Sequence, residues 1–263
     1  MHPVITVLEL GPRPLPIGSY GLLLALALAL GAVLTLRAAT RAGMDGGAVV
    51  AVLGCTVAGG FVGGWALHLV VQAARLGSWS EALQRPGLAF YGAGLGGLLA
   101  LAVSARALAV PALALLDRAV VAVALAHAVG RVGCLLGGCC HGAPTTGWVG
   151  VRYDHPLAPA SSLGVPLHPV PLYEASGLLL LALAFGLRVG VDDRRPGRRM
   201  LTYVACYSLL RLALEGLRGD RVRGLWLAAG LSTSQLIALS LLAACALLWP
   251  LLGSARPPAG RLA

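Results

Sequence analysis

Charged side chains are scarce in this chain of 263 residues. Asp, Glu, Lys and Arg together make up 11% of it, against about 25% in an average soluble domain. Hydrophobic residues make up 58% and recur in runs along the whole length. This composition excludes an ordinary soluble domain, and we expect an all-α protein that crosses a membrane several times. Lysine is absent, so all 20 basic residues are arginine; we attribute this to coding bias and not to function.

Several motifs of soluble enzymes are also missing. The sequence has no carboxylate cage for a divalent metal ion, no glycine-rich nucleotide loop after a strand and no nucleophilic serine elbow. It also lacks a basic stripe interleaved with aromatic residues, so we expect no nucleic-acid partner. The net charge of +10 is better explained by membrane topology and by attraction to anionic lipid in the bilayer.

The apolar runs predict seven transmembrane helices, since about 20 helical residues cross the hydrocarbon core. The segments are residues 20–36, a stretch within 46–74, 87–105, 119–136, 172–187, 200–217 and a stretch within 225–252. The positive-inside rule places the N-terminus outside and the C-terminus inside, mainly because of the arginine cluster in residues 192–199. Glycine-rich runs at 59–64 and 92–97 suit close contact between helices in lipid.

We expect residues 1–263 to form a single transmembrane domain with one long polar interruption. Residues 137–171, between the fourth and fifth segments, are rich in glycine and proline. They are too many for a simple connection, and long loops are usually functional. We predict that they form an extracytoplasmic loop or cap with little regular secondary structure.

Two arginines lie inside apolar segments, where ionisable residues are rare and usually functional. Arg131 and Arg211 lie in the fourth and sixth segments, each about 18–20 Å along its helix from the cytoplasmic end. Tyr207, Arg211, Glu215 and Arg218 are spaced by three or four residues and therefore share one helix face. Glu215 can pair with Arg211 or with Arg218, which lowers the cost of burying either charge.

Other polar residues fall at the same depth, near the outer ends of their segments. They are Tyr20, Tyr91, His168, Tyr173, Glu174 and Gln235, whereas His127 lies one helical turn before Arg131. Because several segments bring polar groups to one layer, we predict a polar cavity in the outer leaflet. The planar guanidinium of arginine suits phosphate, and an apolar surround that opens toward lipid indicates the phosphate of a phospholipid.

Short motifs in a fixed order and spacing extend over nearly the whole chain. They are Ser19-Tyr20-Gly21, Phe90-Tyr91-Gly92, Gly130-Arg131-Val132-Gly133, Gly142-Ala143-Pro144-Thr145, His168-Pro169, Leu172-Tyr173-Glu174, and the set Tyr207, Arg211, Glu215, Arg218, Ser232 and Gln235. In these motifs and in its seven segments the chain resembles the prolipoprotein diacylglyceryl transferases of bacterial plasma membranes.

The resemblance implies an enzyme that moves a diacylglyceryl group from phosphatidylglycerol to the lipobox cysteine of a prolipoprotein signal peptide, releasing glycerol phosphate without a cofactor. It implies a multi-pass protein of the bacterial plasma membrane, with its active site toward the outer leaflet. It implies catalytic roles for Arg131, Arg211, Tyr20 and Tyr91. It implies substrate binding by Arg131, Arg211, Glu215, Arg218, His168, Tyr173, Glu174, Gln235 and Cys134. A same-fold paralogue that acts on another lipid or acceptor, and a non-catalytic lipid-binding membrane protein, are the alternatives.

The chain departs from that family after Arg131. Cys134 and Gly137 stand where the family has asparagines, and Cys139 stands in place of a glutamate. Together with Cys140 and His141, these cysteines make four zinc ligands on paper, but adjacent ligands at 139 and 140 are awkward for one tetrahedral site. We therefore expect no metal site. A disulfide on the oxidising side of the membrane, small packing residues and a thiol that lines the site are the alternatives.

Overall fold

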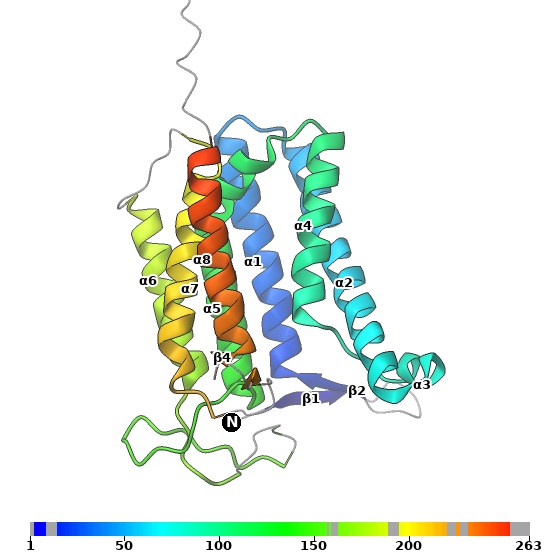
Figure 1. Cartoon of the computed structure of the whole chain (residues 1–263), viewed down its shortest axis with the longest axis vertical. Coiled ribbons are helices and arrows are strands. Elements are labelled where there is room, and N and C mark those ends of the chain that lie inside the picture. The colour runs from blue at the N-terminus through cyan, green and yellow to red at the C-terminus, as the bar shows by residue number, and fades with distance from the viewer. Residues whose placement is uncertain are drawn as a thin grey trace, which may run out of the picture. The chain divides into compact units, whose positions relative to one another are not determined.

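The computed structural model describes residues 3–8, 15–156, 158, 163–188, 195–219, 225–226 and 231–252. Helices make up most of this part of the chain (Figure 1). They are α1 (Ser19–Arg41), α2 (Gly46–Leu76), α3 (Trp79–Leu83), α4 (Phe90–Ala107), α5 (Ala112–Gly137), α6 (Val170–Gly186), α7 (Arg198–Glu215) and α8 (Thr233–Leu251). Two short antiparallel ribbons pair β1 (Val4–Leu8) with β2 (Leu15–Gly18), and β3 (Leu225–Trp226) with β4 (Leu231–Ser232).

Five of the described helices, α1, α2, α4, α5 and α8, are long and apolar enough to cross a membrane. Helix α6 is apolar but has only 17 residues, and α7 carries several arginines and hydroxyl side chains. Each of the seven predicted segments overlaps one of these helices. The structure adds α3, which the sequence analysis missed because this helix has only five residues.

The start of α5 was predicted too late. The helix begins at Ala112, so that Asp117 and Arg118 lie within it and not before it. Pro111 immediately precedes the helix, and its carbonyl accepts the backbone N–H of Leu115 at 2.9 Å. A proline at the start of a helix is tolerated because the N–H that it lacks would have no partner inside the helix anyway. The charged pair misled the prediction because it lies one turn after this start.

The chain divides into two compact units, residues 32–118 and residues 1–31 with 119–263. In the first unit, α2 and α4 approach each other through glycines, as the sequence predicted. A Cβ atom on Gly63 would lie 2.4 Å from the carbonyl oxygen of Gly92, and one on Gly96 would lie 2.3 Å from that of Gly59. Real Cβ atoms do not come so close, so only glycine permits this contact between two backbones.

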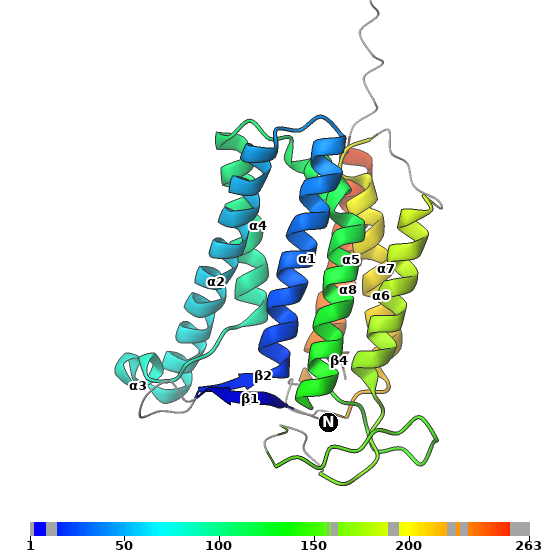
Figure 2. The ribbon, with the colours of Figure 1, turned by 180° about the vertical axis from the view of Figure 1, so that it is seen from behind.

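In the second unit, α5 and α7 run in one direction while α6 and α8 run in the other (Figures 1 and 2). Small residues recur along α5 and let α6 and α7 come close to it. The buried cluster they form consists of Val120, Ala124, Ala128, Ala175, Leu178, Ala182, Phe185 and Tyr203. Residues spaced by seven or eight share a helix face, so the stripe extends to Arg131 on α5 and to Arg211 on α7. The fold thereby places both arginines on buried faces.

The loop between α5 and α6 contains no helix among its described residues and is held by three isolated bridges. Gly142 pairs with Arg218, and Leu167 pairs with both Pro144 and Val151. Tyr153 is wholly buried with Leu167 in a small core of the loop, and this burial raises the pKa of Tyr153 to about 12. The bridge to Arg218 ties the loop to the chain just after α7.

We predict that Gly63→Ala lowers the melting temperature of the detergent-solubilised protein, because the added methyl group meets the α4 backbone. Overpacking of this kind costs about 1–3 kcal/mol. Gly54→Ala is the matched control: Gly54 lies in α2, is exposed, and has no atom within 4 Å of an added Cβ. Alanine there should leave the melting temperature unchanged or raise it, since helix propensity improves by about 1 kcal/mol. Equal effects of the two substitutions would contradict the glycine contact.

Candidate active site

Arg131 of α5 and Glu174 of α6 form a buried ion pair, with Nη2 of the arginine 2.9 Å from Oε1 of the glutamate. Glu174 is 0% exposed. The Nε–H of Arg131 also donates to Nε2 of His127, one turn earlier in the helix, at 3.3 Å. The hydroxyl of Tyr207, on α7, donates to Oε1 of Glu174 at 2.7 Å. Three helices therefore meet at one carboxylate oxygen.

The second carboxylate oxygen of Glu174 is in a different situation. Oε2 is buried and has no hydrogen-bond partner among the described residues. Around the pair, the rings of His127 and Tyr207 lie 4.9 Å apart, and Tyr203 stacks on Tyr207 at 6.4 Å. The pair thus lies beside aromatic rings, and one of its acceptor atoms has no partner among the described residues.

Arg211 of α7 belongs to a second polar network. Its Nη2 lies 2.8 Å from Oε2 of Glu215, one turn later, which is one of the two pairings that the sequence left open for this glutamate. The same Nη2 donates to the hydroxyl of Ser234 on α8 at 3.1 Å. Arg211 is 7% exposed, and its Nη1 is buried without a hydrogen-bond partner among the described residues. This arginine therefore keeps donor capacity that no described side chain uses.

The start of α8 completes this network. Ser232 is the N-cap of the helix, and its hydroxyl donates to Oε1 of Glu215 at 2.6 Å. The side-chain oxygen of Gln235 accepts the backbone N–H of Ser232 at 2.9 Å, so serine and glutamine form a capping box. Gln235, predicted to bind substrate, is therefore occupied with fixing the helix terminus that carries Ser234.

The remaining predicted residues near the loop have distinct surroundings. His168 Nδ1 lies 3.3 Å from the hydroxyl of Tyr173, and the His168 carbonyl accepts the N–H of Gly142 at 2.8 Å. Arg218 lies just after α7, and its backbone pairs with Gly142. The backbone of Gly142 therefore contacts the backbones of both His168 and Arg218.

Tyr20 lies in the first turn of α1, against the end of α5. A Cβ atom on Gly133 would be 3.5 Å from Cδ2 of Tyr20, and one on Gly137 would be 3.4 Å from its Cβ. Tyr20 therefore lies over the last turns of the helix that carries Arg131, and it is 44% exposed. Tyr91 belongs to the other compact unit, in the first turn of α4, and is 43% exposed; its place in the site stays a prediction.

Three cysteines gather at the C-terminal end of α5. The sulfur atoms of Cys134, Cys139 and Cys140 all lie within 4.8 Å of one another, and the structure has them as thiols. Hydrogen bonds with the neighbouring thiols, followed by burial, raise the pKa of Cys139 far above its ordinary value. His141 is not part of this group, and its Nδ1 lies 3.0 Å from the Gly142 carbonyl oxygen.

Sequence reasoning missed the role of Ser234. This serine is only 8% exposed and is the partner of Arg211 on α8. It lies in the run Ser232-Thr233-Ser234-Gln235, which is typical of a helix N-terminus. The sequence analysis therefore had no reason to assign Ser234 a role in the site. The polarity of this run at the start of a long apolar segment was the signal that could have found it.

The fold and these two networks define a class of protein. It is a multi-pass membrane protein with two buried arginines, each paired with a glutamate, at one end of its helices. The family is prolipoprotein diacylglyceryl transferase, whose model matches residues 6–251, and the chain belongs to it. This confirms the resemblance found in the sequence.

Three relatives illustrate the similarity. Phosphatidylglycerol–prolipoprotein diacylglyceryl transferase 2 of Clostridium perfringens is 34% identical over 238 residues, covering 87% of this chain and 88% of the relative. The phosphatidylglycerol–prolipoprotein diacylglyceryl transferase of Clostridium tetani is 32% identical, covering 86% of this chain and 89% of the relative. That of Synechococcus elongatus is 35% identical, covering 82% and 77%. The similarity therefore extends over most of each chain.

We predict that Tyr207→Phe destabilises the folded protein, because it removes a hydrogen bond to a buried carboxylate worth about 1.5–3 kcal/mol. Tyr203→Phe is the matched control, since the Tyr203 hydroxyl is buried without a hydrogen-bond partner among the described residues. Its loss should be neutral or stabilising. Thermal unfolding in detergent measures both. A larger loss for Tyr203→Phe than for Tyr207→Phe would show that Glu174 is not held in this way.

Proposed function

We propose that this chain transfers the diacylglyceryl group of phosphatidylglycerol to the lipobox cysteine of prolipoprotein signal peptides. Family membership and the names of relatives that match over most of their length support this. Within the chain, the supporting observation is Arg211, whose buried Nη1 has no hydrogen-bond partner among the described residues. An anionic phosphate is a partner that suits such a donor.

The proposed reaction is a substitution at the glyceryl carbon next to the phosphate. The acceptor thiol loses its proton to solvent, a sulfur–carbon bond forms, and the carbon–oxygen bond breaks. The electron pair of that bond leaves on the oxygen of glycerol phosphate. Negative charge therefore grows on the leaving group, where fixed guanidinium donors lower the barrier most effectively. The substitution changes no oxidation state, so the reaction as proposed needs no redox cofactor.

The residues divide into groups with different proposed roles. Arg131 and Arg211 contact the phosphate, while Glu174 and Glu215 orient them from behind, since each carboxylate holds one arginine at 2.8–2.9 Å. Tyr20 lies over the end of α5 and lines the path of the acceptor. The other proposed site residues, by resemblance alone, are Tyr91, Arg218, His168, Tyr173, Gln235 and Cys134.

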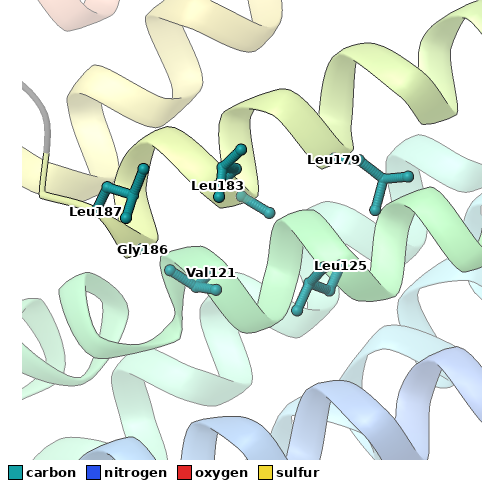
Figure 3. A pocket seen from close by; sticks show the side chains of 7 residues that line it. Val121, Leu125, Leu179, Leu183, Gly186 and Leu187 are labelled. Atoms are coloured by element: carbon teal, nitrogen blue, oxygen red, sulfur yellow. The ribbon is translucent and has the colours of Figure 1, made fainter.

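An apolar pocket beside the site suits an acyl chain of the donor. It lies between α5 and α6 (Figure 3). Its lining consists of Val121, Leu125, Leu179, Ala182, Leu183, Gly186 and Leu187. Leu125 lies fewer than two turns before Arg131, and Leu179 fewer than two turns after Glu174. If the lipid phosphate contacts the arginines, an acyl chain of the same lipid would lie against these aliphatic side chains.

The proposal includes a topology. Helices α1, α2 and α4–α8 cross the bacterial plasma membrane as a single domain, with the N-terminus outside and the C-terminus inside. Residues 137–171 lie on the extracytoplasmic side and the active site faces the outer leaflet. The arginine distribution supports this orientation. The α5–α6 loop is tied at Gly142 to the chain after α7. It therefore lies at the same end of the helices as the polar networks, so the proposed active site is on the side of this loop.

Labelling of single cysteines tests this topology. Trp148 is 96% exposed in the α5–α6 loop, so Trp148→Cys should react with a membrane-impermeant maleimide in intact cells. Pro196, exposed just before α7, lies inside in the proposed topology, so Pro196→Cys should react only after permeabilisation. The reactivity of the unaltered chain is subtracted. Labelling of both positions from the same side would rule out the proposed arrangement.

We predict that Arg131→Lys and Arg211→Lys each lower transfer by about 100-fold or more, as removal of one charge-stabilising donor does in other enzymes. A point ammonium group does not reproduce the planar fork of arginine. Thioether formation on a lipobox peptide with phosphatidylglycerol vesicles measures the rate. Rescue of a strain depleted of its transferase, scored by lipoprotein mobility, measures function in cells.

Arg106→Lys provides the control for these variants, because Arg106 is exposed in the last turn of α4. It should leave the rate unchanged, and immunoblotting should find all three variants in the membrane at equal levels. If Arg131→Lys and Arg211→Lys both transfer lipid at the unaltered rate, the proposed phosphate contact is wrong.

A same-fold enzyme with another donor or acceptor is the second candidate function. It is favoured by Cys134 and Cys139, which stand where the resemblance expects an asparagine and a glutamate. Transfer from phosphatidylethanolamine, or to a thiol peptide without a lipobox, at a higher rate than in the standard assay would select it. Lipid binding without turnover of any donor would instead select a non-catalytic role.

A further inference from the structure

The backbone after α5 folds back and brings three cysteine side chains together. Gly138, with φ 75°, turns the chain, and the N–H of Cys139 donates to the carbonyl oxygen of Cys134 at 3.1 Å. Cys140 adopts the left-handed conformation, with φ 60°. This conformation costs a residue with a side chain about 1–2 kcal/mol. It resolves the difficulty of adjacent residues, because Cys139 and Cys140 both place their sulfur atoms near that of Cys134.

The arrangement of the three sulfur atoms is closer to a ligand set than to a disulfide. A disulfide joins two cysteines and would leave the third thiol beside it. Three protein ligands with a fourth position open is instead the pattern of an open zinc site. With metal–sulfur distances of about 2.3 Å, sulfur ligands in a tetrahedral site lie about 3.8 Å apart. Sulfur atoms within 4.8 Å of one another reach that geometry by small side-chain rotations.

Burial also fits a metal site. Cys134 is 8% exposed, whereas Cys139 and Cys140 are half-buried on the side of the loop. A cation can therefore reach the sulfur atoms from the loop side while Cys134 closes the inner side. The other three cysteines are not in this group.

We propose that Cys134, Cys139 and Cys140 bind one thiophilic d¹⁰ metal cation, Zn²⁺ or Cu⁺, as three thiolates. Soft thiolate ligands favour these ions over Mg²⁺, Ca²⁺ and Mn²⁺. On binding, three sulfur–hydrogen bonds break, three sulfur–metal bonds form, and the protons go to solvent. Nothing is oxidised or reduced. The site stands independently of the proposed transferase activity, because its ligands and their geometry do not depend on any lipid substrate.

The test uses the full chain, reduced and purified in detergent. Cd²⁺ replaces Zn²⁺ as a probe, because its thiolate complexes absorb in the ultraviolet in proportion to the number of sulfur ligands. We expect one Cd²⁺ per chain with the absorbance of three thiolates. If the site favours zinc, a chain first loaded with Zn²⁺ should release one Zn²⁺ per Cd²⁺ bound, because the softer Cd²⁺ binds thiolates more tightly. Cu⁺, supplied from a competing chelator, should displace both ions if the site favours copper.

Two variants with three substitutions each separate the cluster from cysteines in general. Cys134→Ser with Cys139→Ser and Cys140→Ser should bind Cd²⁺ about 100-fold or more weakly, since second-shell changes alone cost 10–100-fold. The matched control, Cys55→Ser with Cys206→Ser and Cys245→Ser, should bind like the unaltered chain. Cys139→Ser alone, with an unchanged melting temperature, should reduce the absorbance to that of two thiolates. This single variant keeps the test valid if the triple variant unfolds.

Two results would overturn the metal site. One is equal Cd²⁺ binding by the cluster variant and the unaltered chain. The other is a disulfide between two of the three cysteines in protein isolated without reductant, found by intact-protein mass spectrometry, together with no Cd²⁺ binding above the cluster variant after reduction. The second result would assign the cluster to a disulfide.

Discussion

The buried ion pair between Arg131 and Glu174 is the interaction that joins α5, α6 and α7 at the candidate site. Taking each charge out of water costs several kcal/mol, and good geometry with further hydrogen bonds is needed to offset it. Here the Tyr207 hydroxyl and the pair itself meet at one oxygen of Glu174. The small residues below the pair, such as Ala128 and Ala175, let α5 and α6 come close enough for a 2.9 Å contact. Packing and electrostatics therefore specify the same helix register.

Each buried arginine has its own carboxylate, and this has a consequence for the proposed catalysis. Because Glu174 and Glu215 neutralise Arg131 and Arg211, the pairs offer a phosphate oriented N–H donors more than net charge. In the proposed mechanism, we expect such a site to bind an anionic lipid only weakly in the ground state and to stabilise more strongly the additional charge on a departing phosphate. Interactions that strengthen only in the transition state raise the rate, whereas uniform binding does not.

What the sequence could predict depended on distance along the chain. Helical spacing narrowed the partner of Glu215 to Arg211 or Arg218, and the helices followed from long apolar runs. The pairing of Arg131 with Glu174 could not be read in this way, because it joins two helices whose relative rotation is set by packing. The capping role of Gln235 was not foreseen, because a polar residue at the start of an apolar segment fits a helix cap as well as a binding site. The meeting of three thiols depends on a left-handed Cys140, a conformation that no residue pattern indicated.

The end of α5 explains why a cation would suit the cysteines there. The last carbonyl groups of a helix lack intrahelical partners and carry partial negative charge. The carbonyl of Cys134 is satisfied by both the N–H and the thiol of Cys139, at 3.1 and 3.6 Å. Thiolates at this position would be repelled by the helix terminus and by one another, so protonated thiols are favoured as long as no cation is bound. A metal ion reverses this balance, since it is attracted by the same carbonyl groups and stabilises all three thiolates at once. The negative end of the helix thus disfavours unbound thiolates and favours a cation that the thiolates would bind.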